Sequence, residues 1–150
     1  MTRDDLYDFL RDQRYAVLAT ASPAGPQAAI MGVTPTRSLE LVFLTGRTSR
    51  KYANLLAEPR VALVLGSTEE TTVQYEGIAR EVVGDALAPY AAAHRKRFPD
   101  GRAQAEQPEI AYFVVTPRWV RHSSYAGRAG ARVDRGDDGA VRGDRPRGGR

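Results

Sequence analysis

The sequence predicts a mainly β protein, an antiparallel β-barrel, closed or partly closed, with helices at its edges. Three observations indicate this class. Short apolar runs alternate with turn residues along most of residues 15–123, which is typical of strands. Only three segments have a helical pattern. The chain of 150 residues, 42% of them hydrophobic, suffices for one domain with one core.

Six apolar runs have the length and the boundaries expected of strands. Turn residues separate them, with Ser-Pro-Ala-Gly-Pro after the first run and Pro-Thr-Arg-Ser after the second. In the third run, Leu39, Leu41 and Phe43 fall on one face, and Glu40 points the other way. The predicted strands are residues 15–21, 27–34, 39–45, 60–66, 72–83 and 110–116, and residues 119–123 are expected to add a seventh piece.

Three helices are expected around these strands. The first begins after Thr2, whose side chain can cap it. The second, residues 48–57, ends before Pro59. The third, residues 85–98, can include Pro89 only because that residue falls near its first turn.

Residues 126–150 differ from the rest of the chain in composition. They contain seven Gly, no aromatic residue, and seven Arg against four Asp, so they carry most of the net charge of +4. Such a segment buries too little apolar surface to offset the entropy of ordering it. We therefore expect one domain, residues 1–125, followed by a disordered Gly/Arg/Asp-rich tail, residues 126–150. Because the body is nearly neutral, charge does not favour nucleic-acid binding by the domain.

Composition also excludes several kinds of site. The chain has no cysteine, which excludes disulfides, thiol nucleophiles and cysteine-ligated metals. Its two histidines, His94 and His122, are far apart in sequence, so no metal site is expected. The first residues are charged, and no run of about 18 apolar residues occurs, so neither a signal peptide nor a membrane span is predicted. The expected location is cytoplasmic.

Structural roles are favoured for both histidines. His94 lies in an alanine-rich helix next to Arg95, Lys96 and Arg97, which indicates an exposed helix end where cations are favourable. His122 lies close to Trp119, and for it the alternative is that it lines a pocket.

One stretch, residues 43–51 (FLTGRTSRK), can carry chemistry. Ser49, or the threonine before it, can cap the helix that follows the tight turn. Arg50 and Lys51 then fall in the first helical turn, where the helix dipole disfavours cations unless an anion lies among them. Together with Arg47, the hydroxyls and the free backbone N–H groups, they would bind a phosphate monoester. The alternative is a capped surface helix with solvated basic residues, and the spacing alone leaves both interpretations open.

The segment FLTGRTSRKYANL, followed by EPRVALVLG and VQYEGIARE, resembles the flavin-binding split β-barrels related to pyridoxamine 5′-phosphate oxidase. The resemblance covers about residues 3–125, including the ATASPAGPQAAIMGV hairpin and the PRWVRHS ending. The strand–turn–SRK–helix element is fairly specific, and its order relative to the other pieces adds to that specificity. The resemblance implies a six-stranded antiparallel split β-barrel over residues 1–125. It also implies a homodimer with flavin mononucleotide (FMN) at the subunit interface.

The resemblance further assigns cofactor contacts to residues in several separate segments. These are Ser49, Arg50 and Lys51 for the phosphate; Leu44 and Thr45 for the ribityl chain and ring; Ala29, Ile30, Met31, Gly32, Val33 and Thr34 for the edge of the ring; and Thr72, Gln74 and Trp119, which would approach from two further strands. Because a flavin carries its own redox chemistry, the protein needs no acid–base pair, and no catalytic residue is assigned.

The sequence departs from the vitamin B6 oxidases proper in two places. Their second basic cluster, near the carboxy terminus, is replaced here by RWVRHSSYAGRAGAR, in which His122 is out of position. The arginine expected early in the second strand is missing, since residues 27–34 are uncharged. We therefore expect an FMN-dependent oxidoreductase that acts on a different small organic substrate.

Three alternatives stay open. A deazaflavin-dependent reductase would use the same fold. A non-catalytic module would bind flavin or haem, and haem would need His94 or His122 as axial ligand. The third is an interaction protein whose basic tail, residues 126–150, recruits nucleic acid; the aspartates in the tail dilute its positive field, so this binding would be weak.

Overall fold

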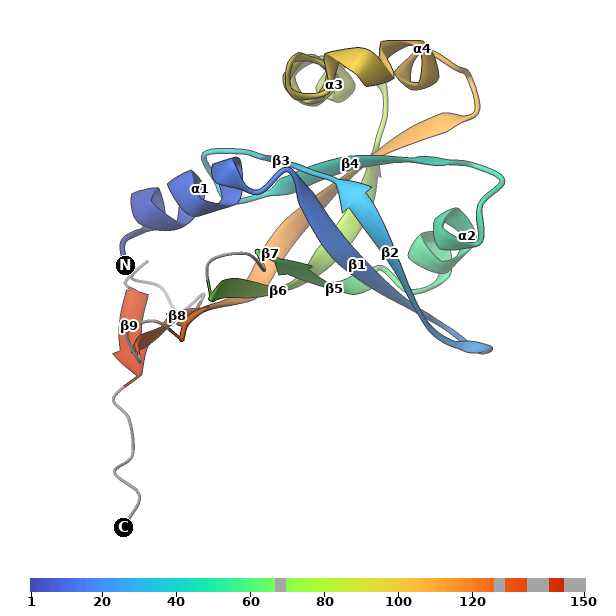
Figure 1. The fold of residues 1–150 in the computed structure, drawn as a ribbon. Coiled ribbons are helices and arrows are strands. Elements are labelled where there is room, and N and C mark those ends of the chain that lie inside the picture. Colours follow the sequence, from blue (N-terminus) through green and yellow to red (C-terminus); the bar gives the residue numbers. More distant parts are fainter. Residues whose placement is uncertain (67–69, 126–128, 135–140, 145–150) are drawn as a thin grey trace.

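The computed structural model describes residues 1–66, 70–125, 129–134 and 141–144 (Figure 1). Its strands are β1 (Tyr15–Ser22), β2 (Gly25–Gly32), β3 (Thr34–Pro35), β4 (Leu41–Gly46), β5 (Arg60–Leu65), β6 (Thr71–Val82), β7 (Ile110–Ser124), β8 (Ala129–Asp134) and β9 (Val141–Asp144). Its helices are α1 (Arg3–Asp12), α2 (Arg50–Ala57), α3 (Leu87–Arg97) and α4 (Arg102–Ala105), with 3-10 turns at Gly84–Ala86 and Pro99–Gly101. Over the described residues, no helix has the length and the apolar character needed to cross a membrane.

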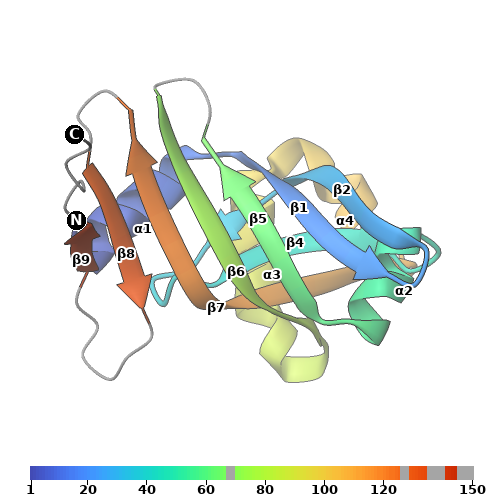
Figure 2. The ribbon, with the colours of Figure 1, turned by 90° about the horizontal axis from the view of Figure 1, so that it is seen from below.

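One antiparallel sheet forms the body of the protein, with the strand order β2-β1-β5-β6-β7-β4-β3 (Figure 2). The predicted split β-barrel is confirmed, although the strand count differs. The expected second strand divides at Val33, whose N–H donates to the carbonyl of Arg14 (3.1 Å), and β3 then pairs with β4 instead of β1. The expected seventh piece, residues 119–123, is the second half of β7.

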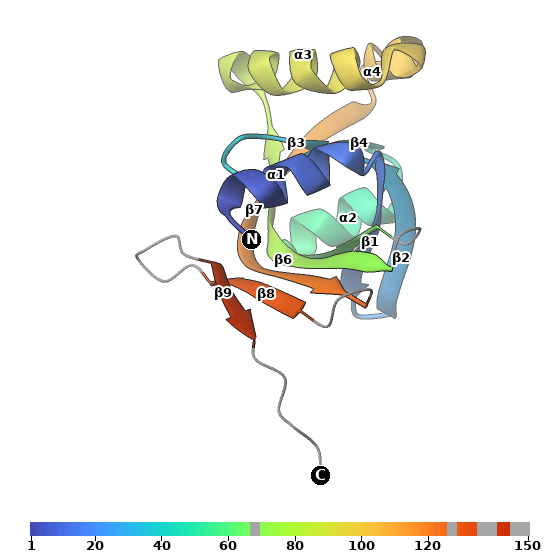
Figure 3. The same ribbon diagram turned by 60° about the vertical axis from the view of Figure 1, so that its left-hand side comes forward.

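Two apolar layers explain why β4 and β7 are apolar on both faces. Leu41 and Phe43 of β4 point into the barrel, where Phe43 stacks on Phe113 at 5.6 Å between ring centroids. The alternate residues, such as Val42 and Val114, pack instead beneath α3. The helices α1 and α2 lie at opposite ends of the barrel (Figure 1), whereas α3 and α4 lie together over one side of it (Figure 3).

The three expected helices form where the sequence indicates. Thr2 caps α1 through a reciprocal capping box with Asp5. Ser49, not the threonine before it, caps α2 by accepting from the N–H of Tyr52. The third helix begins at Leu87, which leaves Pro89 in its first turn.

Two stretches of the segment for which the sequence predicts disorder are strands in this structure. β8 continues the sheet by pairing with β7, and β9 pairs with β8. The physical reason is that β7 runs on to Ser124, so its backbone offers unpaired hydrogen-bonding groups that a following segment can use. The prediction for residues 126–128, 135–140 and 145–150 lies outside the described residues. The division into a domain and a tail therefore stays a prediction.

Gly77 is required by the close approach of β6 and β7. A β-carbon there would lie 2.4 Å from the carbonyl oxygen of Thr116 and 2.7 Å from Val115 Cγ1, beside an irregularity in the strand register. We expect Gly77→Ala to lower the free energy of unfolding by about 1–3 kcal/mol, because backbone must shift to admit the methyl group. Gly46→Ala is the control, since its β-carbon would meet nothing within 4 Å. Equal urea midpoints for the two variants would contradict this explanation.

Candidate functional site

The first turn of α2 gathers hydroxyl groups and cations where β4 ends. Thr45 Oγ1 lies 3.1 Å from Ser49 Oγ, which joins the end of β4 to the helix cap. The N–H groups of Arg50 and Lys51, the first two of the helix, have no acceptor within it. No acidic residue lies in this turn to compensate the cations. The arrangement has the donors and the charge that bind a phosphate.

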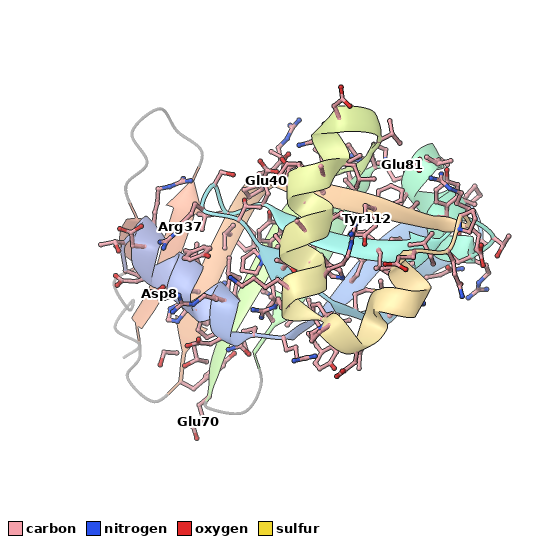
Figure 4. The ribbon with its side chains drawn as sticks, turned by 90° about the horizontal axis from the view of Figure 1, so that it is seen from above. Asp8, Arg37, Glu40, Glu70, Glu81 and Tyr112 are labelled. Atoms are coloured by element: carbon pink, nitrogen blue, oxygen red, sulfur yellow. The ribbon has the colours of Figure 1, made fainter. Side chains whose placement is uncertain are left out.

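Of the three cations predicted to converge here, the structure brings only two to this position. Arg47 forms an ion pair with Glu81 of β6 and donates to the hydroxyl of Tyr52 (3.0 Å). Glu81 lies beside α2 (Figure 4) and also accepts from Tyr52 (3.1 Å). Arg47 therefore fastens the turn to the sheet, and its inclusion among the anion-binding cations was wrong because a neighbouring strand supplies its partner.

Arg50 and Lys51 remain available to a ligand. Within the described part of the chain, neither forms an ion pair with a carboxylate. Lys51 is half-buried, and this burial lowers the pKa of its ammonium group. An unpaired, partly desolvated ammonium group is costly unless an anion joins it.

Strand β2, which supplies the predicted contacts to the ring edge, is tied to α2. The side-chain amide of Asn54 donates to Gln27 of β2 (2.9 Å) and to Thr20 of β1 (3.3 Å). This buried bridge sets the position of α2 relative to β1 and β2. Sequence reasoning missed Asn54 and Gln27, although a polar residue amid the apolar face of a short helix was a signal.

The remaining predicted contacts lie elsewhere on the sheet. Gln74 is exposed on the outer face of β6, and Trp119 pairs with Glu76 on the same face. Glu81 of β6 accepts from Tyr52 in the first turn of α2, and Gln74 is seven residues, about 23 Å, from Glu81 along the strand. Within one chain, therefore, the structure does not bring Gln74, Thr72 or Trp119 to the start of α2.

The same outer face carries an exposed apolar row. Ile30, Val17 and Val64 are cross-strand neighbours on β2, β1 and β5, and the row continues to Gln74. Their side chains are 72%, 41% and 44% exposed, respectively. A contiguous apolar surface of this kind is typical of an interaction site.

The expectation of an exposed His94 was wrong. The residue is 4% exposed, and its Nδ1 lies 2.9 Å from Thr34 Oγ1. Burial, together with the nearby charge of Arg97, lowers the pKa of His94 to about 4. The signal that was missed is helical spacing, since Leu87, Ala91 and His94 share the face of α3 that packs on the sheet.

His122 occupies a different place, against the first helix. Its ring packs edge-on to Phe9, with centroids 5.6 Å apart, and partial burial lowers its pKa. The two histidines therefore lie on separate sides of the barrel. Among the described residues there is no group of three or more acidic or histidine side chains that would hold a metal ion.

Known proteins share both the sequence pattern and the fold. The family profile described as pyridoxamine 5′-phosphate oxidase matches residues 2–124. No curated protein matches the chain. A haem-binding protein from Mycobacterium smegmatis superposes with a TM-score of 0.77 at 21% identity, over 88% of this chain and 57% of that one. This chain thus spans little more than half the length of that protein.

Two other solved structures cover most of both chains. An FMN-binding protein from Nostoc punctiforme, described as related to pyridoxamine 5′-phosphate oxidase, has a TM-score of 0.67 at 16% identity, over 87% of this chain and 86% of its own. HutZ, a haem storage protein from Vibrio cholerae, has a TM-score of 0.67 at 17% identity, over 78% and 91%. At these identities the structures establish the fold, and the profile match establishes the family. The chain belongs to the pyridoxamine 5′-phosphate oxidase family.

Proposed function

We propose that this protein is an FMN-dependent oxidoreductase that acts on a small organic substrate. The observation that carries the proposal is the pair Arg50 and Lys51, which lack carboxylate partners among the described residues and stand at the capped start of α2. The phosphate of FMN supplies the anion that this turn lacks. The FMN-binding relative from Nostoc punctiforme supports the same cofactor.

The residues around this turn fit such a cofactor. Lys51 and Arg50 would neutralise the phosphate, while Ser49 and Thr45 would offer hydroxyls beside it. Leu44 and residues 29–34, which span the end of β2 and the start of β3, would form the apolar and backbone lining of the ring, as the family resemblance implies. Bound flavin supplies two-electron transfer, and the protein orients it and tunes its ring.

We further propose that the active form is a homodimer, joined through the outer face of β2, β1 and β5. The exposed row of Ile30, Val17 and Val64 supports this arrangement. A second copy would also supply the contacts that one chain keeps apart, because Gln74 and Trp119 lie on that face and not at the start of α2. The cofactor would then lie between the two subunits.

The proposed dimer interface can be tested with one substitution in the apolar row. Val17→Glu should convert a dimer into a monomer, because it places a charge in the middle of the apolar row. Val83→Glu is the matched control, since Val83 is 63% exposed and lies at the end of β6, outside the row. Light scattering after gel filtration measures both masses. A monomeric unsubstituted protein, or a dimer that survives Val17→Glu, would contradict this interface.

The cofactor itself is tested by the visible absorption spectrum of the purified protein and by the mass of any released chromophore. The proposal predicts a two-banded flavin spectrum and the mass of FMN. A single deazaflavin-like band would make the protein a deazaflavin-dependent reductase instead. A protein that stays colourless and takes up no added FMN would refute the flavin proposal.

A haem-binding module is the second candidate function. It is favoured by two observations: His94 is buried, neutral and in contact with a cavity, and two structural relatives are haem proteins. An intense Soret band after haem addition that disappears in His94→Ala would support it. Haem uptake that is unaffected by replacing either histidine would refute axial ligation by them.

A further inference from the structure

The cavity that His94 contacts has a volume of about 390 Å³ and lies between α3, α4 and the sheet. The residues that line it include Phe98, His94 and Leu44. Arg14 and Arg95 are the only cations among its lining residues, and Asp100 is the only acid. With a neutral histidine, the lining has a net positive charge, and it mixes polar groups with the apolar side chains of Phe98, Leu44 and Ala105. The volume is within the range of small-molecule sites.

One ring nitrogen of His94, Nδ1, is hydrogen-bonded within the protein, which leaves the other, Nε2, for a ligand. Thr34 Oγ1 and His94 Nδ1 form a buried hydrogen bond of 2.9 Å, and the ring leans against Phe98 at 4.8 Å between centroids. If the Thr34 hydroxyl donates, the neutral imidazole carries its proton on Nε2. Nε2–H is then a donor on a ring that lines the cavity.

A buried polar group next to this histidine also lacks a partner. Tyr112 is 5% exposed, and its hydroxyl has no hydrogen-bond partner among the described residues. Its ring lies edge-on to His94, with centroids 6.0 Å apart, beneath α3 on the side that faces α4 (Figure 4). Tyr112 is the cross-strand neighbour of Leu44, which lines the cavity, and it belongs to the apolar cluster against which Ala105 packs. A buried hydroxyl without a partner is uncommon and calls for an explanation such as a ligand.

The cavity adjoins the proposed flavin site. Leu44 lines it and is one of the residues assigned to the cofactor, and Thr34, the partner of His94, is the last of the residues 29–34 assigned to the ring edge, although it lies in β3. A molecule in this cavity would therefore lie beside the flavin and within reach of its ring.

We propose that this cavity binds the substrate, and that the substrate is a small carboxylic acid with an apolar or aromatic body. The carboxylate lies between Arg14, Arg95 and the Nε2–H of His94, and the body packs on Phe98 and Leu44. His94 is a positioning residue whose side chain orients the acid. As a substrate site, the cavity rests on the proposed flavin function.

The test uses benzoate as the probe and benzamide, its uncharged isostere, as the control ligand. Calorimetric titration of the full-length protein is made with and without saturating FMN. We expect benzoate to bind at least tenfold more tightly than benzamide. We also expect benzoate still to bind when the protein is saturated with FMN. Equal binding of the two ligands, or no binding of benzoate, would overturn the proposal.

Two further results would separate this proposal from the flavin proposal. If FMN binds and competes with benzoate, the cavity is the cofactor's own site, and only the substrate assignment fails. If benzoate binds selectively to a protein that takes up no FMN, the cavity remains an acid-binding site, but its role as the substrate site of a flavoenzyme is overturned.

Four substitutions test whether Arg95 and His94 are responsible for the binding of benzoate. Arg95→Gln should weaken benzoate binding by up to about fivefold, because exposed charges contribute little. Lys96→Gln, an exposed neighbour outside the cavity, should have no effect. His94→Asn retains a polar atom facing Thr34 but removes Nε2, and should weaken benzoate binding about tenfold or more. His94→Gln, which extends an amide towards the position of Nε2, should restore much of the affinity. Identical affinities in all four variants would overturn the assignment.

Discussion

Replacing Lys51 with methionine is expected to weaken FMN binding about ten- to a hundredfold and to leave riboflavin binding unchanged. The ammonium group is half-buried, has no carboxylate partner among the described residues, and stands beside free N–H groups of α2. A charge-assisted hydrogen bond to phosphate contributes roughly 1.5–3 kcal/mol, which corresponds to this loss. Riboflavin has no phosphate, so it reports only on the ring and the ribityl chain. Quenching of flavin fluorescence measures both affinities.

Two controls make this result specific. Lys96→Met removes the only other lysine, which lies exposed on α3, and should leave both affinities unchanged. Arg50→Gln should act in the same direction as Lys51→Met, and more weakly because Arg50 is exposed. Equal losses for FMN and riboflavin in Lys51→Met would remove this residue from the phosphate site. The occupied site should also raise the pKa of Lys51, because a nearby anion favours the ammonium form.

The second large effect is a loss of stability in mild acid that depends on His94. Its pKa falls from the ordinary 6.5 to about 4 in the folded protein, first because of burial and second because of the charge of Arg97. Between these two values the unfolded chain binds a proton that the folded chain does not. Stability is therefore complete above pH 6.5, falls as the pH falls towards 4, and levels off below it, with a total loss of roughly 3 kcal/mol.

The measurement is urea unfolding between pH 7 and pH 4 for the unsubstituted protein and for His94→Asn. The asparagine cannot titrate, so the part of the pH dependence that belongs to His94 should disappear. His122, whose pKa burial also lowers, is present in both proteins, so its contribution cancels in the comparison. The difference between the two curves thus isolates one group. Parallel curves would show that His94 is not kept neutral by the fold.

Local sequence patterns were sufficient for most of the secondary structure. The capping box of Thr2 and Asp5, the Ser49 cap and the apolar alternation of β5 depend on residues a few positions apart, which the sequence displays directly. The candidate anion-binding turn was recognised for the same reason. Its hydroxyls and cations lie within one short stretch, and their chemistry does not depend on distant parts of the chain.

Contacts between distant segments could not be predicted in this way. Arg47 appeared to belong to the anion site until β6 brought Glu81 to it, 34 positions along the chain. His94 appeared exposed until α3 folded onto β3 and Thr34, 60 positions away, supplied its hydrogen bond. In each case the environment of a polar side chain is set by a partner that is distant in sequence and that only the folded sheet brings close to it.

The amino-acid sequence by itself thus determines the barrel class and the make-up of the turn proposed to bind phosphate, because both depend on periodicity or on neighbours in sequence, and its motifs also indicate the family. Only the tertiary structure decides that Arg47 is a fastening residue, that His94 lines a cavity, and that Gln74 and Trp119 lie away from α2 on an apolar face. These properties depend on strand register, which sets neighbours across the sheet. Register is determined by the packing of the whole barrel.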